Sequence, residues 1–112
     1  VFPVQAMDWA IAHPPGERVF NSFPWGGYLL FRTWPDVTVF IDGQTDFYGE
    51  ELTREYETVI TLAEGWEQVL ARYDVDWVIM PTESQLVRAL RMSGRWKVAY
   101  EDTVAAVLSR IR

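Results

Sequence analysis

Residues 18–49 read RVFNSFPWGGYLLFRTWPDVTVFIDGQTDFYG, and this stretch decides the fold. Its two short apolar runs, 18–21 and 37–41, have the length of buried strands. The second run, VTVFI, is rich in the β-branched and aromatic residues that strands favour. Between the runs, residues 25–34 predict a short apolar helix, which a Pro-Asp pair ends with a turn. A strand, a helix and a second strand in this order are typical of parallel pairing in an α/β protein.

The flanking segments extend this unit in both directions. Residues 3–13 predict a helix that ends at the Pro-Pro-Gly run following it. The rest of the chain predicts two helices, a third strand, a helix that Thr82 or Ser84 caps, and a β-hairpin. The two helices are expected at residues 50–62 and 66–73, and the third strand at 76–80. The capped helix is expected from residue 82 or 84 to about 92, and the two hairpin strands at 95–100 and 104–109.

The predicted elements form a three-layer α/β fold, with helices on both faces of a mostly parallel five-stranded sheet and a C-terminal antiparallel hairpin. Residues 104–108 (VAAVL) are apolar at every position, as expected of a strand buried on both faces. Residues 97–100 are more mixed and suit an edge. Numbering strands along the chain, we predict the order 2-1-3-5-4, with 2-1-3-4-5 as the alternative. Residues 1–112 are predicted to form a single domain.

Composition limits the partners of this chain. Its formal net charge is −6 and its pI about 4.6, which argues against nucleic acid, because a phosphate backbone requires clustered Lys and Arg. There is no Cys, and so no disulfide framework or thiolate metal site. No apolar run approaches the ~20 residues that span a bilayer. The chain starts with Val-Phe-Pro, directly before a helical pattern, and we therefore expect it to be a fragment of a longer protein.

Four carboxylates after the second predicted strand form the first candidate site: Asp42, Asp46, Glu50 and Glu51. Open α/β sheets bind ligands outside the carboxyl ends of their strands, where Asp42 would lie. Paired carboxylates can act as acid and base or hold a divalent cation. The favoured interpretation is structural, because an Asp-Gly pair closes a turn and acidic residues in a first helical turn suit the helix dipole.

Trp25-Gly26-Gly27-Tyr28 is the second candidate site. Two glycines after a strand can let a phosphate approach a helix N-terminus, but their spacing fits neither common phosphate-binding glycine motif. We expect instead that this turn packs closely on the sheet beneath its two aromatic rings.

His13, the single histidine, is expected near a helix C-terminus without a catalytic or metal role. The sequence also lacks a G-x-S-x-G elbow, so its residues predict no catalytic group, no metal and no cofactor.

The run RVFNSFPWGGYLLFRTWPDVTVFIDGQTDFYGEEL, followed by WEQVLARYDVDWVIMP, resembles the C-terminal soluble domain of bacterial polytopic membrane proteins that are glycosyltransferase-like. Those proteins are similar to the GT-C class, which includes oligosaccharyltransferases and protein mannosyltransferases. The resemblance covers nearly the whole chain, and the Trp-Gly-Gly-Tyr-Leu segment, the Ile-Asp-Gly turn and the Asp-Trp-Val strand carry it together. It implies a domain on the extracytoplasmic side of the cell membrane, after transmembrane helices whose loops would carry any acidic residues for sugar transfer.

Two positions depart from that pattern. The oligosaccharyltransferases have a Trp-Trp-Asp-Tyr-Gly acceptor motif at a loosely similar place, but residues 24–28 read PWGGY and lack its Asp. Acceptor-peptide binding is therefore not carried over to this chain. Gln44 stands where the family often has Arg after Asp-Gly, so an anion-binding role is not carried over either.

The resemblance implies a non-catalytic extracytoplasmic domain that packs on, or gates, the membrane-embedded site of a glycosyltransferase-like protein. One alternative is a small ligand-binding module with a pocket at the C-terminal ends of strands 1 and 3. Another is a stand-alone enzyme that uses Asp42 and Asp46. The expected partners are the transmembrane portion of the parent protein and a glycan or lipid-linked sugar nearby, without nucleic acid.

Aromatic residues are concentrated in the loops after the first two strands: Phe23, Trp25, Tyr28, Phe47 and Tyr48. The favoured interpretation is that these rings fill the core, because a small sheet needs large side chains to cover it. In the alternative interpretation they form a partly exposed patch, rimmed by acidic residues, on which the membrane part docks. The residues predicted for docking and its rim are Trp25, Tyr28, Asp42, Asp46, Phe47 and Tyr48.

Overall fold

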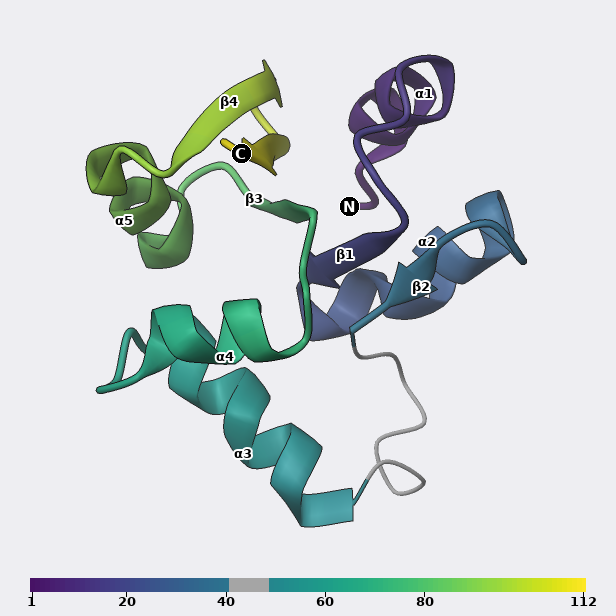
Figure 1. The fold of residues 1–112 in the computed structure, drawn as a ribbon. Helices are drawn as coiled ribbons and strands as arrows, with labels where there is room; N and C mark the ends of the chain where they lie inside the picture. The colour runs from purple at the N-terminus through teal and green to yellow at the C-terminus, as the bar shows by residue number, and fades with distance from the viewer. Residues whose placement is uncertain (41–48) are drawn as a thin grey trace.

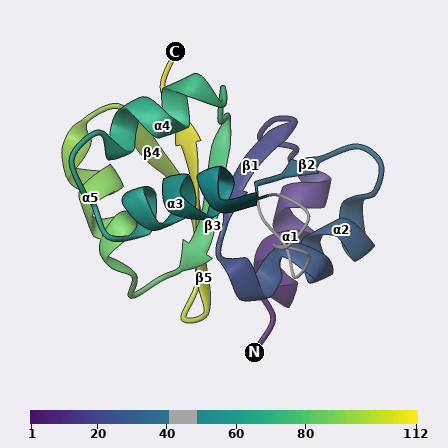
Figure 2. The same cartoon turned by 90° about the horizontal axis from the view of Figure 1, so that it is seen from below.

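The structure is a computed structural model that describes residues 1–40 and 49–112. Among these residues, five strands form one sheet in the order β2-β1-β3-β5-β4, as the sequence predicts (Figures 1 and 2). The strands are β1 (Arg18–Asn21), β2 (Thr38–Val39), β3 (Trp77–Pro81), β4 (Trp96–Glu101) and β5 (Ala105–Arg110). The helices are α1 (Val4–Ala12), α2 (Gly26–Thr33), α3 (Gly49–Ile60), α4 (Trp66–Arg72) and α5 (Gln85–Ser93), and a 3-10 turn at Phe23–Trp25 precedes α2.

The sheet is mixed rather than mostly parallel. β1 pairs in parallel with β2 on one side and with β3 on the other. β5 runs antiparallel to both of its neighbours, β3 and β4, because the C-terminal hairpin folds back beside β3. Ala105 to Leu108 of β5 are fully buried, which agrees with the all-apolar sequence of this strand. The inner position therefore goes to the more apolar strand of the hairpin, and the alternative strand order is wrong.

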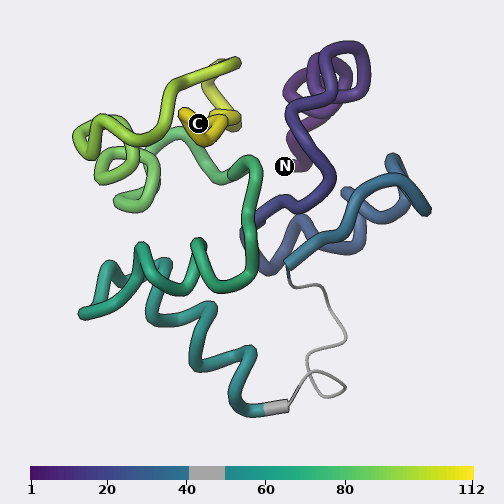
Figure 3. Tube along the Cα trace, viewed as in Figure 1, coloured from purple at the N-terminus to yellow at the C-terminus, as the bar shows by residue number. Residues whose placement is uncertain are grey.

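Alternate residues of each strand point to opposite layers of helices. Val19 of β1 and Trp77 of β3 pack in the core against α1 and α2. Their neighbours Phe20 and Val78 pack in a second core, beneath α3, α4 and α5. Figures 1 and 2 show these two groups of helices on opposite sides of the sheet. In the trace of Figure 3, the purple and blue N-terminal segment gathers on one side and the teal and green segment on the other, so the three-layer prediction is confirmed.

The predicted elements lie within two residues of their observed bounds, and at two of them the structure shows why the bounds differ. β2 is limited to Thr38–Val39, because the backbone N–H of Phe40 donates to the side-chain Oδ1 of Asn21 at 2.9 Å. The helix expected over residues 25–34 is α2, and it starts only after the 3-10 turn that contains Pro24. Both differences lie beside the end of β1, where side chains replace strand pairing.

The helix after β3 starts from the second of its two candidate caps. Ser84 is the N-cap of α5, and its hydroxyl accepts the N–H of Val87 at 3.4 Å. The hydroxyl of Thr82 donates instead to the carbonyl of Asp102 at 2.7 Å. Thr82 therefore ties the end of β3 to the turn of the β4–β5 hairpin.

Candidate functional site

The carboxyl ends of β1 and β3 mark the switch point of the sheet. From β1 the chain passes through α2 to β2, and from β2 it passes through α3 and α4 to β3. These two connections lie on opposite faces of the sheet, so the switch point falls between β1 and β3, next to Asn21 and Pro81. Open α/β sheets usually bind ligands at such a point. The sequence places its expected ligand pocket and acidic rim at this edge.

Asn21, the last residue of β1, is completely buried at the switch point. Its Oδ1 accepts the backbone N–H of Phe40 at 2.9 Å, and its Nδ2 donates to the carbonyl of Ser22 at 2.8 Å. A buried amide that is hydrogen-bonded through both ends holds the backbone around it in a fixed geometry. Asn21 therefore joins the end of β1 to the segment that follows β2.

Tyr56 of α3 reaches the same edge from the opposite layer. Its hydroxyl accepts the backbone N–H of Phe23 at 2.8 Å, and its ring stacks on Phe20 with 5.5 Å between ring centroids. Burial raises the pKa of the Tyr56 hydroxyl, although the hydrogen bond from Phe23 acts in the opposite direction. Tyr56 therefore stays protonated at neutral pH and anchors the start of the 3-10 turn, which is a structural role.

Asp102 orders the β4–β5 turn, which lies beside the carboxyl end of β3. Its Oδ1 accepts the N–H groups of Val104 at 2.7 Å and Ala105 at 2.9 Å, and its Oδ2 accepts the hydroxyl of Tyr100 at 2.7 Å. Burial by itself raises the pKa of this carboxyl, but the hydrogen bonds from Ala105, Tyr100 and Val104 outweigh burial and leave the pKa below its ordinary value. The ionised carboxylate is thus the form that the folded turn prefers.

Asp102→Asn should lower the stability of the domain at neutral pH, with an effect that shrinks in acid. The amide can still accept the two backbone N–H groups, but it loses the charge that strengthens them. Because the folded pKa of Asp102 is depressed, its contribution is present above the unfolded pKa of about 3.9 and is lost as pH falls through the folded pKa. Urea unfolding of both proteins between neutral and acidic pH measures this difference. A gap between the two proteins that stays constant with pH would contradict the prediction.

The predicted acidic rim is only partly within the described residues. Asp42, Asp46, Phe47 and Tyr48 lie outside them. Glu50 and Glu51 are exposed in the first turn of α3, which is the structural position expected for them. Glu50 also forms an ion pair with Arg54, one helical turn further on, with 3.6 Å between its Oε2 and Nη2 of Arg54.

Trp25 and Tyr28, the other residues predicted for docking, are held in different ways. Trp25 is only 6% exposed and belongs to the core beneath α1 and α2, and its Nε1–H donates to the carbonyl of Val1 at 3.0 Å. The exposed-patch interpretation is therefore wrong for Trp25. Tyr28 is half-buried. Its ring stacks on that of Phe2 with 4.9 Å between the ring centroids, and its hydroxyl accepts a hydrogen bond from Nη1–H of Arg32 at 2.6 Å.

The remaining residues of the second candidate site and His13 have local roles. Gly26 is buried, but Gly27 is exposed, and a Cβ added there would meet nothing within 4 Å. Close packing is therefore the wrong explanation for Gly27. His13 is the C-cap of α1, as predicted, and its exposed ring stacks on Trp9 at 5.0 Å between centroids.

The outer side of the α1–α2 layer carries large apolar side chains that sequence reasoning did not single out. Phe31 is 83% exposed and Trp34 is 75% exposed, both at the C-terminal half of α2 or just after it. Phe2, Val4 and Ile11, in α1 or before it, are also exposed. We call these five residues the α1–α2 surface. Exposed apolar side chains that gather on one layer indicate a contact surface.

This layer is also poor in charge. Residues 1–36 contain three acidic and two basic residues, for a net charge of −1. Residues 37–112 carry the other 13 acidic and eight basic residues, for a net charge of −5. The acidity of the protein therefore lies mainly in the other part of the chain, and the α1–α2 surface suits a mainly apolar contact. In the sequence, the run YLLFRTW indicates this surface. Its apolar residues lie on most sides of the helix, whereas packing on the sheet can bury only one side.

A hollow of about 340 Å³ opens between the C-terminal ends of α1 and α2, at the amino end of β3. Ile11 and Trp34 of the α1–α2 surface line it, together with the buried Trp77 and with Gly16. It lies at the opposite edge of the sheet from the predicted ligand pocket. The described residues thus offer a concave surface where the sequence did not place one.

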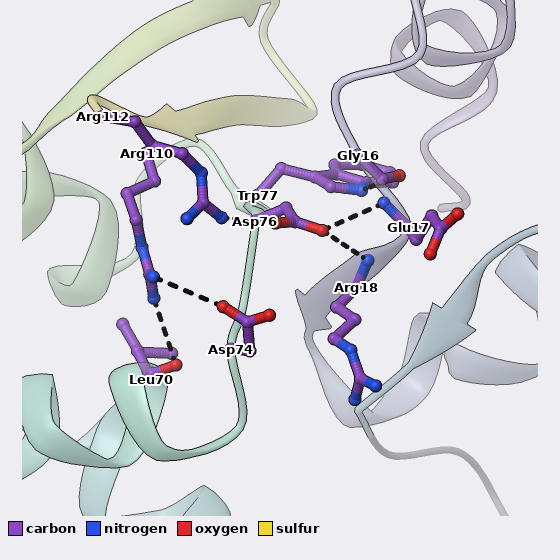
Figure 4. A network of polar contacts seen from close by, with 9 residues as sticks. All are labelled: Gly16, Glu17, Arg18, Leu70, Asp74, Asp76, Trp77, Arg110 and Arg112. Carbon is purple, nitrogen blue, oxygen red and sulfur yellow. Dashed lines mark hydrogen bonds and ion pairs between the residues drawn. The ribbon is translucent and has the colours of Figure 1, made fainter.

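Asp76 fixes the backbone at Glu17, a residue that lines this hollow (Figure 4). Its Oδ2 accepts the N–H groups of Glu17 at 3.1 Å and Arg18 at 3.0 Å, and its Oδ1 accepts Nη2–H of Arg112 at 2.5 Å. Beside it, Nε1–H of Trp77 donates to the carbonyl of Gly16 at 3.0 Å. With these partners, Asp76 holds the segment that enters β1 against the start of β3, and its role is structural.

Neither a metal centre nor a membrane span emerges from the part of the chain that the structure describes. Within residues 1–40 and 49–112, no three His, Cys, Asp or Glu side chains gather as a metal site would require. No helix among the same residues has the length and apolar composition to cross a bilayer. Comparison of the chain with protein-family models, curated proteins and solved structures gives no match.

Proposed function

We propose that this chain is a non-catalytic extracytoplasmic domain of a membrane glycosyltransferase-like protein, where it packs on or gates the membrane-embedded site. The observation that carries the proposal is the α1–α2 surface, with Phe31 and Trp34 largely exposed. A side chain of this size in water costs free energy that burial against a partner recovers. The sequence resemblance supplies the kind of partner, the transmembrane portion of the same protein.

The polar groups of the described residues support a scaffold role. Asn21, Tyr56, Asp76 and Asp102 are each engaged in hydrogen bonds that join strands, turns or helices. Within the described residues, no buried side-chain nitrogen or oxygen lacks a hydrogen-bond partner. A catalytic group needs free hydrogen-bonding capacity toward a substrate. These four side chains serve the fold, whereas Phe31 and Trp34 of the α1–α2 surface are largely exposed, which favours docking.

The chain has no cysteine, and this allows a direct test by single-cysteine labelling. Phe31→Cys and Met92→Cys are a matched pair, because these side chains are 83% and 86% exposed and lie on opposite helical layers. In the 112-residue chain, both thiols should react equally fast with a membrane-impermeant maleimide. In the full-length membrane protein, the Phe31→Cys thiol should react about tenfold more slowly, because an interface covers it, and the Met92→Cys thiol should not.

The double variant Phe31→Ser/Trp34→Ser adds a functional readout. It should change the stability of the 112-residue chain by no more than about 0.5 kcal/mol, because both rings are mostly in water. The full-length protein should lose assembly or transferase activity, whereas Met92→Ser should leave both intact. Equal labelling of both cysteine variants in the full-length protein would overturn the proposal. So would a gene that encodes Met directly before Val1 and no hydrophobic spans.

A further inference from the structure

The hollow between α1 and α2 has the make-up of a binding site for one apolar group. Its floor contains Met7, Ala10 and Trp77, which are at most 4% exposed. Ile11 and Trp34 stand at its sides, where both are open to solvent. The volume of about 340 Å³ is at the low end of the ~300–1,000 Å³ typical of ligand pockets. The hollow therefore has room for a side chain or two, but not for a large cofactor.

The rim of the hollow favours a positive charge. Glu17 and Asp36 line it, both exposed, and among the described residues neither side chain has a hydrogen bond or ion pair. Arg32 lines it too, but its guanidinium is already held by Asp8 at 2.6 Å and by the hydroxyl of Tyr28 at 2.6 Å. An apolar floor with two unpaired carboxylates at its rim favours a ligand in which a positively charged group lies next to an apolar group.

The size of the exposed area distinguishes a polypeptide from a small molecule. Phe31 does not line the hollow, yet it is the most exposed aromatic residue of the α1–α2 surface. A small ligand that filled the hollow would leave Phe31 and much of Trp34 in water. A chain segment lying across the end of α2 would cover both rings and place one side chain in the hollow.

The geometry points to this hollow as the docking site for a polypeptide segment in which an aliphatic or aromatic side chain is followed by Lys or Arg. The apolar side chain enters between Ile11 and Trp34, and the cation lies against Glu17 and Asp36. This inference rests on the proposed docking function and names the chemistry of the docking segment.

Short peptides test the inference on the 112-residue chain. The probe is acetyl-Gly-Ser-Leu-Lys-Gly-Ser-amide, with one control peptide that has Glu in place of Lys and another that has Ser in place of Leu. Each is titrated into ¹⁵N-labelled protein, and the indole N–H signal of Trp34 and the amide signal of Ile11 are followed. The Leu-Lys peptide should bind saturably with a dissociation constant in the millimolar range. It should bind about fivefold more tightly than the Leu-Glu peptide, as expected for exposed ion pairs. The Ser-Lys peptide should not saturate.

Variants of the chain locate the two parts of the site. Glu17→Gln/Asp36→Asn should reduce the preference for Lys over Glu to less than about twofold, while Leu-dependent binding persists. Trp34→Ser should abolish binding, whereas Glu64→Gln, a change of an exposed carboxylate elsewhere, should leave it unchanged. Absence of saturable binding, equal affinity for both charged peptides, or full binding by Trp34→Ser would overturn the inference. If Phe31→Cys is nevertheless protected in the full-length protein, the docking proposal stands and only the assigned chemistry of the segment fails.

Discussion

Replacing Gly16 with alanine should lower the free energy of unfolding by about 2–5 kcal/mol, the combined cost of backbone strain and overpacking. Gly16 has φ +151°, a value that residues with side chains rarely adopt. A Cβ at this position would lie 2.4 Å from Cβ of Asp76 and 2.9 Å from its Oδ2. The closest contact involves the first carbon of each side chain, so no rotation about χ1 relieves it.

The surrounding hydrogen bonds prevent Asp76 from moving aside. Its carboxylate holds the N–H groups of Glu17 and Arg18, and its own backbone N–H donates to the carbonyl of Arg18 at 2.8 Å. A shift of Asp76 would therefore break both side-chain and backbone links between β1 and β3. Charge-assisted bonds of this kind are among the stronger ones in proteins, so the chain has no cheap way to accommodate the new methyl group.

Two further variants separate the collision from the backbone strain. Gly94 also has positive φ, +76°, but a Cβ there would meet nothing within 4 Å, so Gly94→Ala should cost only about 1 kcal/mol. Asp76→Gly removes the carbon with which the new methyl collides. In that background, Gly16→Ala should cost clearly less than in the native chain, which a double-mutant cycle by urea unfolding measures. If Gly16→Ala costs no more than Gly94→Ala, the close approach of Gly16 and Asp76 is not a constraint on the fold.

Features set by local sequence could be predicted. The β-branched and aromatic composition of residues 18–21 and 76–80 predicts β1 and β3, and the structure forms both within one residue of those limits. The all-apolar run at 104–108 also predicts which strand of the hairpin lies inside, because only an inner strand is covered on both faces. Patterns of this kind depend on a residue and its near neighbours, which the sequence displays directly.

Features set by distant residues could not be predicted. Gly16 reads only as the end of a helix, and nothing near it indicates Asp76, which lies 60 residues further along the chain and opposite it in the fold. The apolar run of α2 likewise does not show which side faces the sheet. In the structure Trp25 and Leu29 turn inward, so Phe31 and Trp34 are left outside. The candidate surface therefore follows from packing, and its sequence signal is only an excess of apolar residues.

Asn21→Ala should lower the free energy of unfolding by about 2–4 kcal/mol, because it leaves a buried donor and a buried acceptor without their partner. The donor is the backbone N–H of Phe40 and the acceptor is the carbonyl of Ser22. Both residues are less than a tenth exposed, so water cannot replace the amide without a rearrangement. Phe40 also packs on Phe20 with 4.8 Å between ring centroids, and a shift of its backbone would disturb that contact.

The same site should respond to charge in a way that an ordinary surface position would not. Asn21→Asp keeps an acceptor for Phe40 but loses the donor to Ser22 and adds a carboxylate at a completely buried position. Burial raises the folded pKa of such a carboxyl above its unfolded value of about 3.9. The loss of unfolding free energy caused by the buried charge is therefore absent below that pH and grows as pH rises. Urea unfolding at several pH values measures it, with Thr61→Ala as an exposed control expected to change stability by less than about 0.5 kcal/mol. An Asn21→Ala cost as small as that of Thr61→Ala, or an Asn21→Asp cost independent of pH, would mean that this amide does not fix the end of β1.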